Sequence, residues 1–236
     1  MTVPRETAGT NKPVARDGDA GAPRPSAVSF VTTEHFALQS ARAATIAEST
    51  GRGTMFLASA SGGLIALGLV ATATGVGTAF YAFGLVLLPT LSFVGLVTFE
   101  RALQIGLEDY QLMRRIALLR EYYLREAPEL KQYMVSVLLS DVLAGGSLLA
   151  GRASWPAVGQ SFRTVAGMVG VITAVLAGAT AGLIAVVASS HSLAAALVVG
   201  VVVALAAMTV LMRFQERAYR RAGTSRLPAD VDGDAQ

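Results

Sequence analysis

Two long stretches of the chain, residues 53–99 and 164–212, contain no Asp, Glu, Lys or Arg. A helix needs about 20 apolar residues to cross roughly 30 Å of hydrocarbon, so each stretch holds two crossings and a turn. Glycines interrupt the first stretch at Thr72–Thr78, and a polar run interrupts the second at Ser189–Ser192. We therefore predict four transmembrane helices, near Met55–Ala71, Ala79–Phe99, Thr164–Ala188 and Leu193–Met212.

The sequences immediately before and after the first charge-free stretch have the patterns of helices. From Glu100 to Ala127, apolar residues recur every three or four positions and charges occupy the other sides. This pattern predicts an amphipathic helix that continues the second crossing without a break. Thr33–Thr50 has a Thr at a cap position and is followed by Gly51 and Gly53, which predicts a separate short helix. Residues 1–32, rich in Pro, Gly and Ala, are expected to be a disordered leader.

The segment Gln132–Gly151 is apolar enough for a fifth crossing, but Asp141 lies in its middle and Gly145-Gly146 interrupts it. A fifth crossing would also move the arginines of residues 213–236 to the outside, against the preference of Lys and Arg for cytoplasmic loops. We predict a helix in the membrane plane or packed on a partner, with re-entrant and spanning arrangements as the alternatives. Residues 213–236 are expected to be a basic helix and a disordered tail.

These elements predict an all-α, polytopic membrane protein with two transmembrane hairpins and a cytoplasmic helical stalk. Charged residues make up 15% of the chain, against about 25% in an ordinary soluble domain. The expected segments are the leader (1–32), a cytoplasmic helix (33–54), hairpin one (55–99), a cytoplasmic helical module (100–163), hairpin two (164–212) and the basic helix with its tail (213–236).

The basic residues predict the orientation. All 19 Lys and Arg lie outside the two charge-free stretches and none lies in either hairpin turn. Because Lys and Arg of short loops stay in the cytoplasm, both termini are expected to be cytoplasmic in a multi-pass inner-membrane protein that contacts the lipid bilayer. The net charge of +3 is scattered, whereas nucleic-acid binding needs a denser basic stripe, so nucleic acid is not an expected partner.

The sequence contains few residues that could act in catalysis. The chain has no cysteine and two histidines, His35 and His191, which are far apart in the sequence. A metal site needs several converging ligands, and no nucleotide fingerprint or nucleophilic triad is present. Ion carriers usually keep an ionisable residue inside the bilayer, and the predicted crossings have none. We therefore expect no enzyme, no metal and no cofactor, and a small-solute transporter is the least favoured class.

Small residues recur every fourth position on two of the predicted crossings. Such stripes let helices approach closely in lipid. Packing among the four helices explains them, and self-association is the alternative; we expect a homo-oligomer. The candidate packing residues are Gly62 (with Ala58 and Ala66), Gly170, Ala174, Gly178 and Gly182.

The helix after the second crossing carries a candidate anion site. Arginine pairs with phosphate in a two-pronged geometry, and tyrosine can stack on a nucleotide base. A solvated helix face with lipid or carboxylate partners is the alternative. The candidate ligand-binding residues are Arg114, Arg115, Arg120, Tyr110 and Tyr123.

Two stretches, "EHFALQSARAATIAESTGRG" (Glu34–Gly53) and "LVLLPTLSFVGLVTFERALQIGLEDY" (Leu85–Tyr110), resemble small multi-span membrane proteins of actinobacteria. The architecture is also similar to that of the transmembrane effectors of Pycsar antiphage systems, over roughly residues 34–127. In that family a neighbouring cyclase makes a cyclic pyrimidine nucleotide on infection, and the effector then compromises the inner membrane. The resemblance thus implies such a nucleotide as the activating ligand and a nucleotide cyclase as the functional partner.

The sequence therefore leads to two hypotheses of different classes. The first is a non-enzymatic inner-membrane effector of an antiphage system, triggered by a cyclic nucleotide and impairing membrane integrity. The second is a constitutive membrane scaffold whose stalk recruits a cytoplasmic partner. The effector hypothesis predicts dye entry into cells when a cyclase is co-expressed, and the scaffold hypothesis predicts capture of a partner without any nucleotide.

Overall fold

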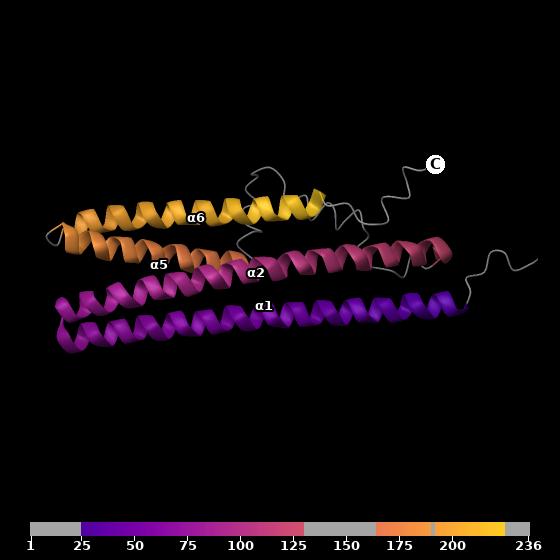
Figure 1. Ribbon diagram of the computed structural model, residues 1–236, viewed down its shortest axis with the longest axis horizontal. Coiled ribbons are helices and arrows are strands. Elements are labelled where there is room, and N and C mark those ends of the chain that lie inside the picture. The colour runs from indigo at the N-terminus through magenta and orange to yellow at the C-terminus, as the bar shows by residue number, and fades with distance from the viewer. Residues whose placement is uncertain (1–24, 130–163, 190–191, 225–236) are drawn as a thin grey trace, which may run out of the picture.

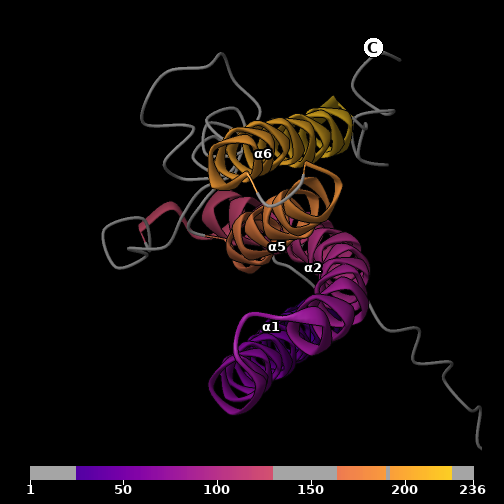
Figure 2. The same cartoon turned by 90° about the vertical axis from the view of Figure 1, so that its left-hand side faces the viewer.

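The computed structural model describes residues 25–129, 164–189 and 192–224, which form four long helices. These are α1 (Pro25–Thr74), α2 (Thr78–Glu126), α5 (Val165–Ala188) and α6 (Leu193–Thr224). The helices α1 and α2 form a long antiparallel hairpin, and α5 and α6 form a shorter hairpin beside it (Figure 1). Viewed end on, the helices are stacked in the order α1, α2, α5, α6 (Figure 2).

The predicted fold class is confirmed, because the described residues form helices and four of these are long and apolar enough to cross a membrane. The predicted segment Gln132–Gly151, most of the leader and the C-terminal tail lie outside the described residues. The helix from Glu100 onward does continue the second crossing: α2 is a single helix of 49 residues that ends at Glu126.

The predicted separate helix at Thr33–Thr50 is wrong, since α1 is a single helix of 50 residues that passes through Gly51 and Gly53. It also begins at Pro25, so residues 25–32 belong to a helix rather than to a disordered leader. A helical glycine costs about 1 kcal/mol relative to alanine, and tertiary packing offsets such a cost. Packing is tight at Gly53, where an added Cβ would lie 2.8 Å from Cγ1 of Val165 on α5.

The four charge-free segments lie side by side at the same level. Val165 at the start of α5 lies against Gly53 of α1, and Gly170 of α5 lies close to both Phe99 of α2 and Met212 of α6. The α1–α2 turn, the end of α5 and the start of α6 all lie at the opposite end (Figure 1). We call this region, residues 53–99 and 165–212, the apolar slab. Its four helical segments contain 20 to 24 residues and are about 30 to 36 Å long, which matches the thickness of a bilayer.

The outer surface of the apolar slab is covered by large apolar side chains. Leu197, Val201 and Leu205 of α6 are each more than half exposed, as is Ile65 of α1. A soluble protein rarely exposes a continuous apolar surface of this extent, whereas lipid tails cover it without penalty. These features indicate a multi-pass membrane protein.

The α1–α2 hairpin has one register along its whole length. Within the slab, added Cβ atoms at Gly63 and Gly84 would contact Leu91 of α2 and Leu67 of α1 respectively. Beyond the slab, Arg42 of α1 pairs with Asp109 of α2. Buried and half-buried residues of α1 recur at spacings of three and four, as in a coiled coil: Leu38, Arg42, Thr45, Ser49, Gly53, Phe56, Ala60 and Gly63. Beyond the slab this hairpin forms a stalk, defined as residues 25–52 of α1 and 100–126 of α2.

Helix α5 packs closely on α6 through small residues. An added Cβ on Gly178 would lie 2.5 Å from the carbonyl oxygen of Gly200, and one on Gly182 would lie 3.1 Å from that of Ala196. Ala174 is fully buried between the neighbouring helices. Gly62 of α1 differs from these, since it is exposed and an added Cβ would meet nothing within 4 Å. The close contact on α1 is made by its neighbour Gly63.

Candidate functional site

The stalk joins the apolar slab at a cluster of charges on α1 and α2. One carboxylate oxygen of Glu48 accepts hydrogen bonds from Nε of Arg52, at 3.0 Å, and from a terminal nitrogen of Arg101, at 3.1 Å. These contacts connect two turns of α1 across Gly51 and also connect α1 to α2. The hydrogen bonds from Arg101 and Arg52 lower the pKa of the exposed Glu48 carboxyl below its usual value of 4.5.

A second ion pair lies two turns further from the slab. Nε of Arg42 donates a hydrogen bond of 2.9 Å to the carboxylate of Asp109, and its terminal nitrogen contacts the sulfur of Met113 at 3.1 Å. Both charged side chains are about one third exposed or less. Ion pairs in this environment contribute more than fully exposed ones, because water screens them less. The pair therefore holds the stalk hairpin in register just outside the slab.

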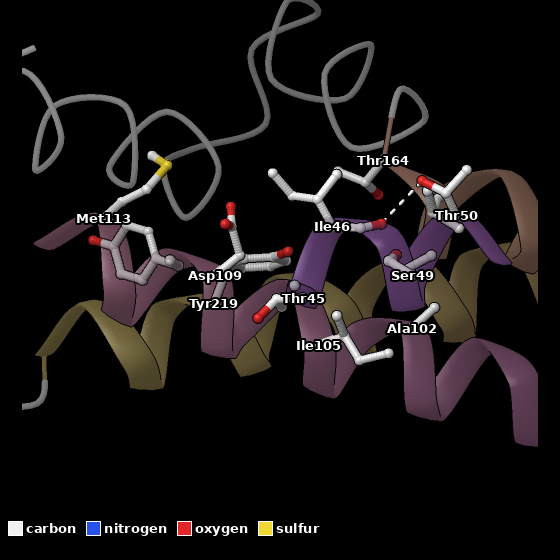
Figure 3. A pocket seen from close by; sticks show the side chains of 14 residues that line it. Thr45, Ile46, Ser49, Thr50, Ala102, Ile105, Asp109, Met113, Thr164 and Tyr219 are labelled. Carbon is white, nitrogen blue, oxygen red and sulfur yellow. Dashed lines mark hydrogen bonds between the residues drawn. The ribbon is translucent and has the colours of Figure 1, made fainter. Parts of the chain in front are cut away.

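The four helices line a partly open cavity of about 340 Å³ between the Glu48 cluster, the Arg42–Asp109 pair and the start of α5. Its floor is apolar and includes Ala102 and Ile105 of α2. Its polar groups come from different helices, as the hydroxyls of Thr45 and Ser49 on α1 and the carboxylate of Asp109 on α2 show (Figure 3). Because every helix contributes to the wall, a molecule in this cavity would contact all four at once.

Tyr219 of α6 closes one side of the cavity. It lies seven residues beyond the slab, is buried, and packs edge to face on Tyr110 with ring centres 6.5 Å apart. Gly106 allows this approach, since an added Cβ would lie 2.5 Å from the Tyr219 hydroxyl oxygen. Burial, followed by the negative charge of Asp109, raises the pKa of the Tyr219 phenol above its usual value of 10.

The N-terminus of α5 forms the remaining wall of the cavity. Oγ1 of Thr164 caps this helix by accepting a hydrogen bond of 3.0 Å from the backbone N–H of Gly167. The same oxygen accepts a hydrogen bond of 3.3 Å from the side-chain amide of Gln215, which is almost completely buried on α6. This hydrogen bond joins α6 to the N-terminus of α5 at the level where the charge-free segments begin.

The five predicted ligand-binding residues do not converge on one site. Tyr110 and Arg114 lie on the side of α2 that faces α6, where a terminal nitrogen of the buried Arg114 donates to the carbonyl oxygen of Ala222 at 3.3 Å. Tyr123 instead faces α1, with its ring 6.2 Å from that of His35. Arg115 is exposed, and Arg120 is half-buried on a further side of the helix. Of the five residues, only Tyr110 lines the cavity.

The described residues include no group of three or more His, Cys, Asp or Glu side chains that could hold a metal ion. His35 lies near the outer end of the stalk, and His191 lies outside the described residues. The cavity wall carries a carboxylate and several hydroxyls, and its described lining contains no Lys or Arg. Such a wall suits a neutral or cationic group better than a phosphate.

Sequence reasoning missed the residues that join the helices at the base of the stalk. Arg42 and Asp109 each interrupt an otherwise uncharged packing side, and a charge in such a position calls for an opposite charge on the neighbouring helix. The turn near Gly75 relates residues of α1 and α2 whose numbers add to about 150. With a helix end predicted at Gly51, residues before Gly51 are no longer expected to continue the α1–α2 hairpin, so this relation cannot be applied to the stalk.

No family model, no curated protein and no solved structure matches this chain.

Proposed function

We propose that the protein is a non-enzymatic membrane effector, in which a signal received by the stalk changes the packing of the four membrane helices and makes the bilayer leaky. The observation that carries the proposal is the continuity of α1 and α2 from the stalk into the apolar slab. A helix that crosses the boundary without a break transmits a shift or rotation of one end to the other, as helix shifts do in other signalling proteins.

The contacts at the boundary supply a route for this transmission. Arg42 and Gly53 lie on the same rigid helix, α1. Moving α1 against α2 at the Arg42–Asp109 pair would therefore displace Gly53 from Val165 of α5. Phe56, one turn further, packs where Gly95 and Thr173 meet, so α2 and α5 would be displaced with it. Close-packed contacts of this kind shift between discrete arrangements rather than deforming smoothly.

The resemblance to Pycsar effectors makes a cyclic pyrimidine nucleotide from a neighbouring cyclase the expected signal. Its phosphate needs a cationic partner, which the described cavity wall does not offer. The exposed Arg115 is the better candidate for contact with the phosphate, so we propose that the nucleotide binds on the stalk surface. The cavity would then be a place where the helices shift against one another and not the nucleotide site. Because Lys and Arg of short loops are usually retained in the cytoplasm, the proposal has the stalk inside the cell and the protein in the inner membrane.

The experiment is a membrane-permeability assay in cells that express the protein with a pyrimidine cyclase. Entry of an impermeant dye is expected only when the cyclase is active. In the variant Gln104→Pro, a proline in the interior of α2 breaks the helix between stalk and slab, and dye entry should be lost. The matched control Gln104→Ala keeps the helix and should keep dye entry. Intact cells with active cyclase, or equal leakage in both variants, contradicts the proposal.

The second candidate is a constitutive scaffold, and exposed aromatic residues on the stalk favour it. Phe30 and Phe36 of α1 are 75% and 69% exposed, although they lie far from the apolar slab. Aromatic side chains are enriched at the centres of protein interfaces relative to the rest of the surface. A scaffold would bind its partner through these residues in cells without a cyclase, so co-purification lost in Phe36→Ser and unaffected by nucleotide would favour this function over the effector.

A further inference from the structure

The side of α1 that faces away from α2 is exposed over more than half of the helix. Residues on this side recur at alternating spacings of four and three, and each of them is small, uncharged and exposed. We call them the outer face of α1: Thr33, Ala37, Ser40, Ala44, Ala47, Gly51, Thr54, Ala58 and Ser61. At about 1.5 Å per residue, the outer face is about 40 Å long.

The outer face begins in the stalk, where lipid does not cover it. A helix that borders water normally carries charges on the side opposite its packed side. Here Arg42 and Glu48 are drawn toward α2 by their ion pairs, and Arg52 is bonded to Glu48. Phe36, at the edge of the outer face, is 69% exposed. Apart from Arg42, which is paired with Asp109, the stalk part of α1 is thus apolar or uncharged on two opposite sides, which is the pattern of a helix packed on both.

The length of the outer face identifies what covers it. A soluble partner would cover Thr33–Gly51 and leave Thr54–Ser61 in the bilayer, whereas lipid would cover only the second range. A single partner that covers both ranges must be a helix that passes from the stalk into the slab at the same level as α1. The α1 helix of a second copy is such a helix. We propose that the outer face of α1 is the interface of a parallel homodimer, with the two-fold axis perpendicular to the membrane.

The chemistry of the outer face suits contact with its own copy. In a two-fold interface, residues near the axis meet the same residues of the other copy, and small uncharged side chains allow this at a helix separation of about 8 Å. One edge of the face carries Glu34 and Glu48, and the other carries Phe36, Thr50 and Leu57. A parallel pair sets the acidic edge of one copy against the uncharged edge of the other, so like charges are not opposed.

The dimer does not depend on the proposed effector function, because a scaffold would present the same face. It also assigns the small residues of α1 a role that the packing within one chain leaves open. Packing within the chain uses Gly53, Ala60 and Gly63 on the side toward α2 and α5, and the outer face uses none of these.

Disulfide crosslinking tests the interface directly, since the chain has no cysteine of its own. The variants Ala37→Cys, Ala44→Cys and Ala47→Cys of the full chain are oxidised in native membranes. A disulfide needs Cα atoms within about 7 Å, so all three should give a band at twice 24.4 kDa. The control Gln111→Cys, on an exposed position of α2 at a similar level, should remain monomeric. Outer-face variants that crosslink no more than this control overturn the proposal.

A second measurement does not require oxidation. The purified protein in lipid nanodiscs should have twice the monomer mass of 24.4 kDa by light scattering. Ala44→Trp inserts a large side chain into the centre of the outer face and should reduce this mass to that of the monomer, whereas Gln111→Trp should leave the dimer intact. A monomeric wild type, or a dimer that survives Ala44→Trp, places no interface on the outer face and overturns the proposal.

Discussion

At the scale of single residues, the fold depends on positions where a neighbouring helix leaves no room for a Cβ atom. Gly95 is the clearest case, because an added Cβ would collide with Oγ1 of Thr173 and lie 2.9 Å from the ring of Phe56. Thr173 is tied to α5 by its hydrogen bond of 2.7 Å to the carbonyl oxygen of Val169, so it cannot easily turn away. Three helices meet at this one glycine.

We therefore expect Gly95→Ala to destabilise the protein by about 1 to 3 kcal/mol, the usual cost of overpacking a close contact. Gly62→Ala is the matched control, because it adds the same methyl group where nothing lies within 4 Å. Its helix propensity should make it neutral or stabilising by up to about 1 kcal/mol. Unfolding in detergent, followed by circular dichroism, measures both. Equal stability of the two variants would contradict the packing at Gly95.

The environment of Tyr219 predicts a pH dependence. Burial and the charge of Asp109 raise the pKa of this phenol above 10, so it stays protonated in the folded protein at pH values where a free tyrosine ionises. A group whose pKa is raised by folding contributes stability below its unfolded pKa and loses that contribution as the pH rises through the folded pKa. Stability should therefore fall above pH 10.

The measurement is the phenolate absorbance of the wild type minus that of Tyr219→Phe, recorded in detergent as the pH is raised. The difference isolates one phenol among the six tyrosines of the chain. Its midpoint should lie above 10, and Tyr219→Phe should remove the corresponding loss of stability. A midpoint at or below 10 would mean that the phenol is solvated and that the cavity is open on the α6 side.

At the scale of elements, the stalk hairpin depends on the register between α1 and α2. If the register is that of the Arg42–Asp109 pair, the double variant Arg42→Cys/Asp109→Cys should be joined within one chain by a short thiol crosslinker. The control Arg42→Cys/Arg115→Cys pairs the same α1 position with an exposed residue of α2 and should not be joined. Proteolysis between the helices followed by electrophoresis separates joined from free chains. The reverse result would show a shifted or splayed stalk.

The same elements show what the sequence predicts well and what it does not. The charge-free stretches predicted four helices apolar enough to cross a membrane and the places where each hairpin turns, because the cost of a charge in hydrocarbon acts at every position. The end of a helix depends on weaker effects. Gly51 and Gly53 together cost about 2 kcal/mol, which contacts with α2 and α5 offset and which sequence alone does not reveal.

The side of a helix that packs is a similar case. Spacing by four alone selected Gly62, whereas the contact on α2 follows spacings of three and four and uses Gly63. A rotation by one residue, about 100°, moves a side chain from the packed side to the exposed side. The candidate anion-binding residues are spread around α2 for the same reason. Tyr110, Arg115 and Tyr123 are close in sequence, but they point in three directions around α2.

At the scale of the whole molecule, the separation of charge from the slab predicts an orientation in the membrane. The turn near Gly75 and the adjoining ends of α5 and α6 lie at one end of the slab, and the stalk and the basic end of α6 lie at the other. Because Lys and Arg of short loops are usually retained inside the cell, we expect the turns to face outward. Single cysteines report this, because Val76 and Ser192 are exposed in or beside the turns, and Gln111 and Arg217 are exposed at the other end.

An impermeant maleimide added to intact cells should label Val76→Cys and Ser192→Cys, and should label Gln111→Cys and Arg217→Cys only after the cells are opened. The two turn positions must behave alike, since both lie at the same end of the slab. Labelling of one turn alone would mean that the hairpins do not lie in one slab, and labelling of Gln111→Cys from outside would place the stalk beyond the reach of any cytoplasmic signal. The effector proposal would fail in that case, whereas the dimer through the outer face of α1 would stand, because it requires only that both copies cross the membrane in the same direction.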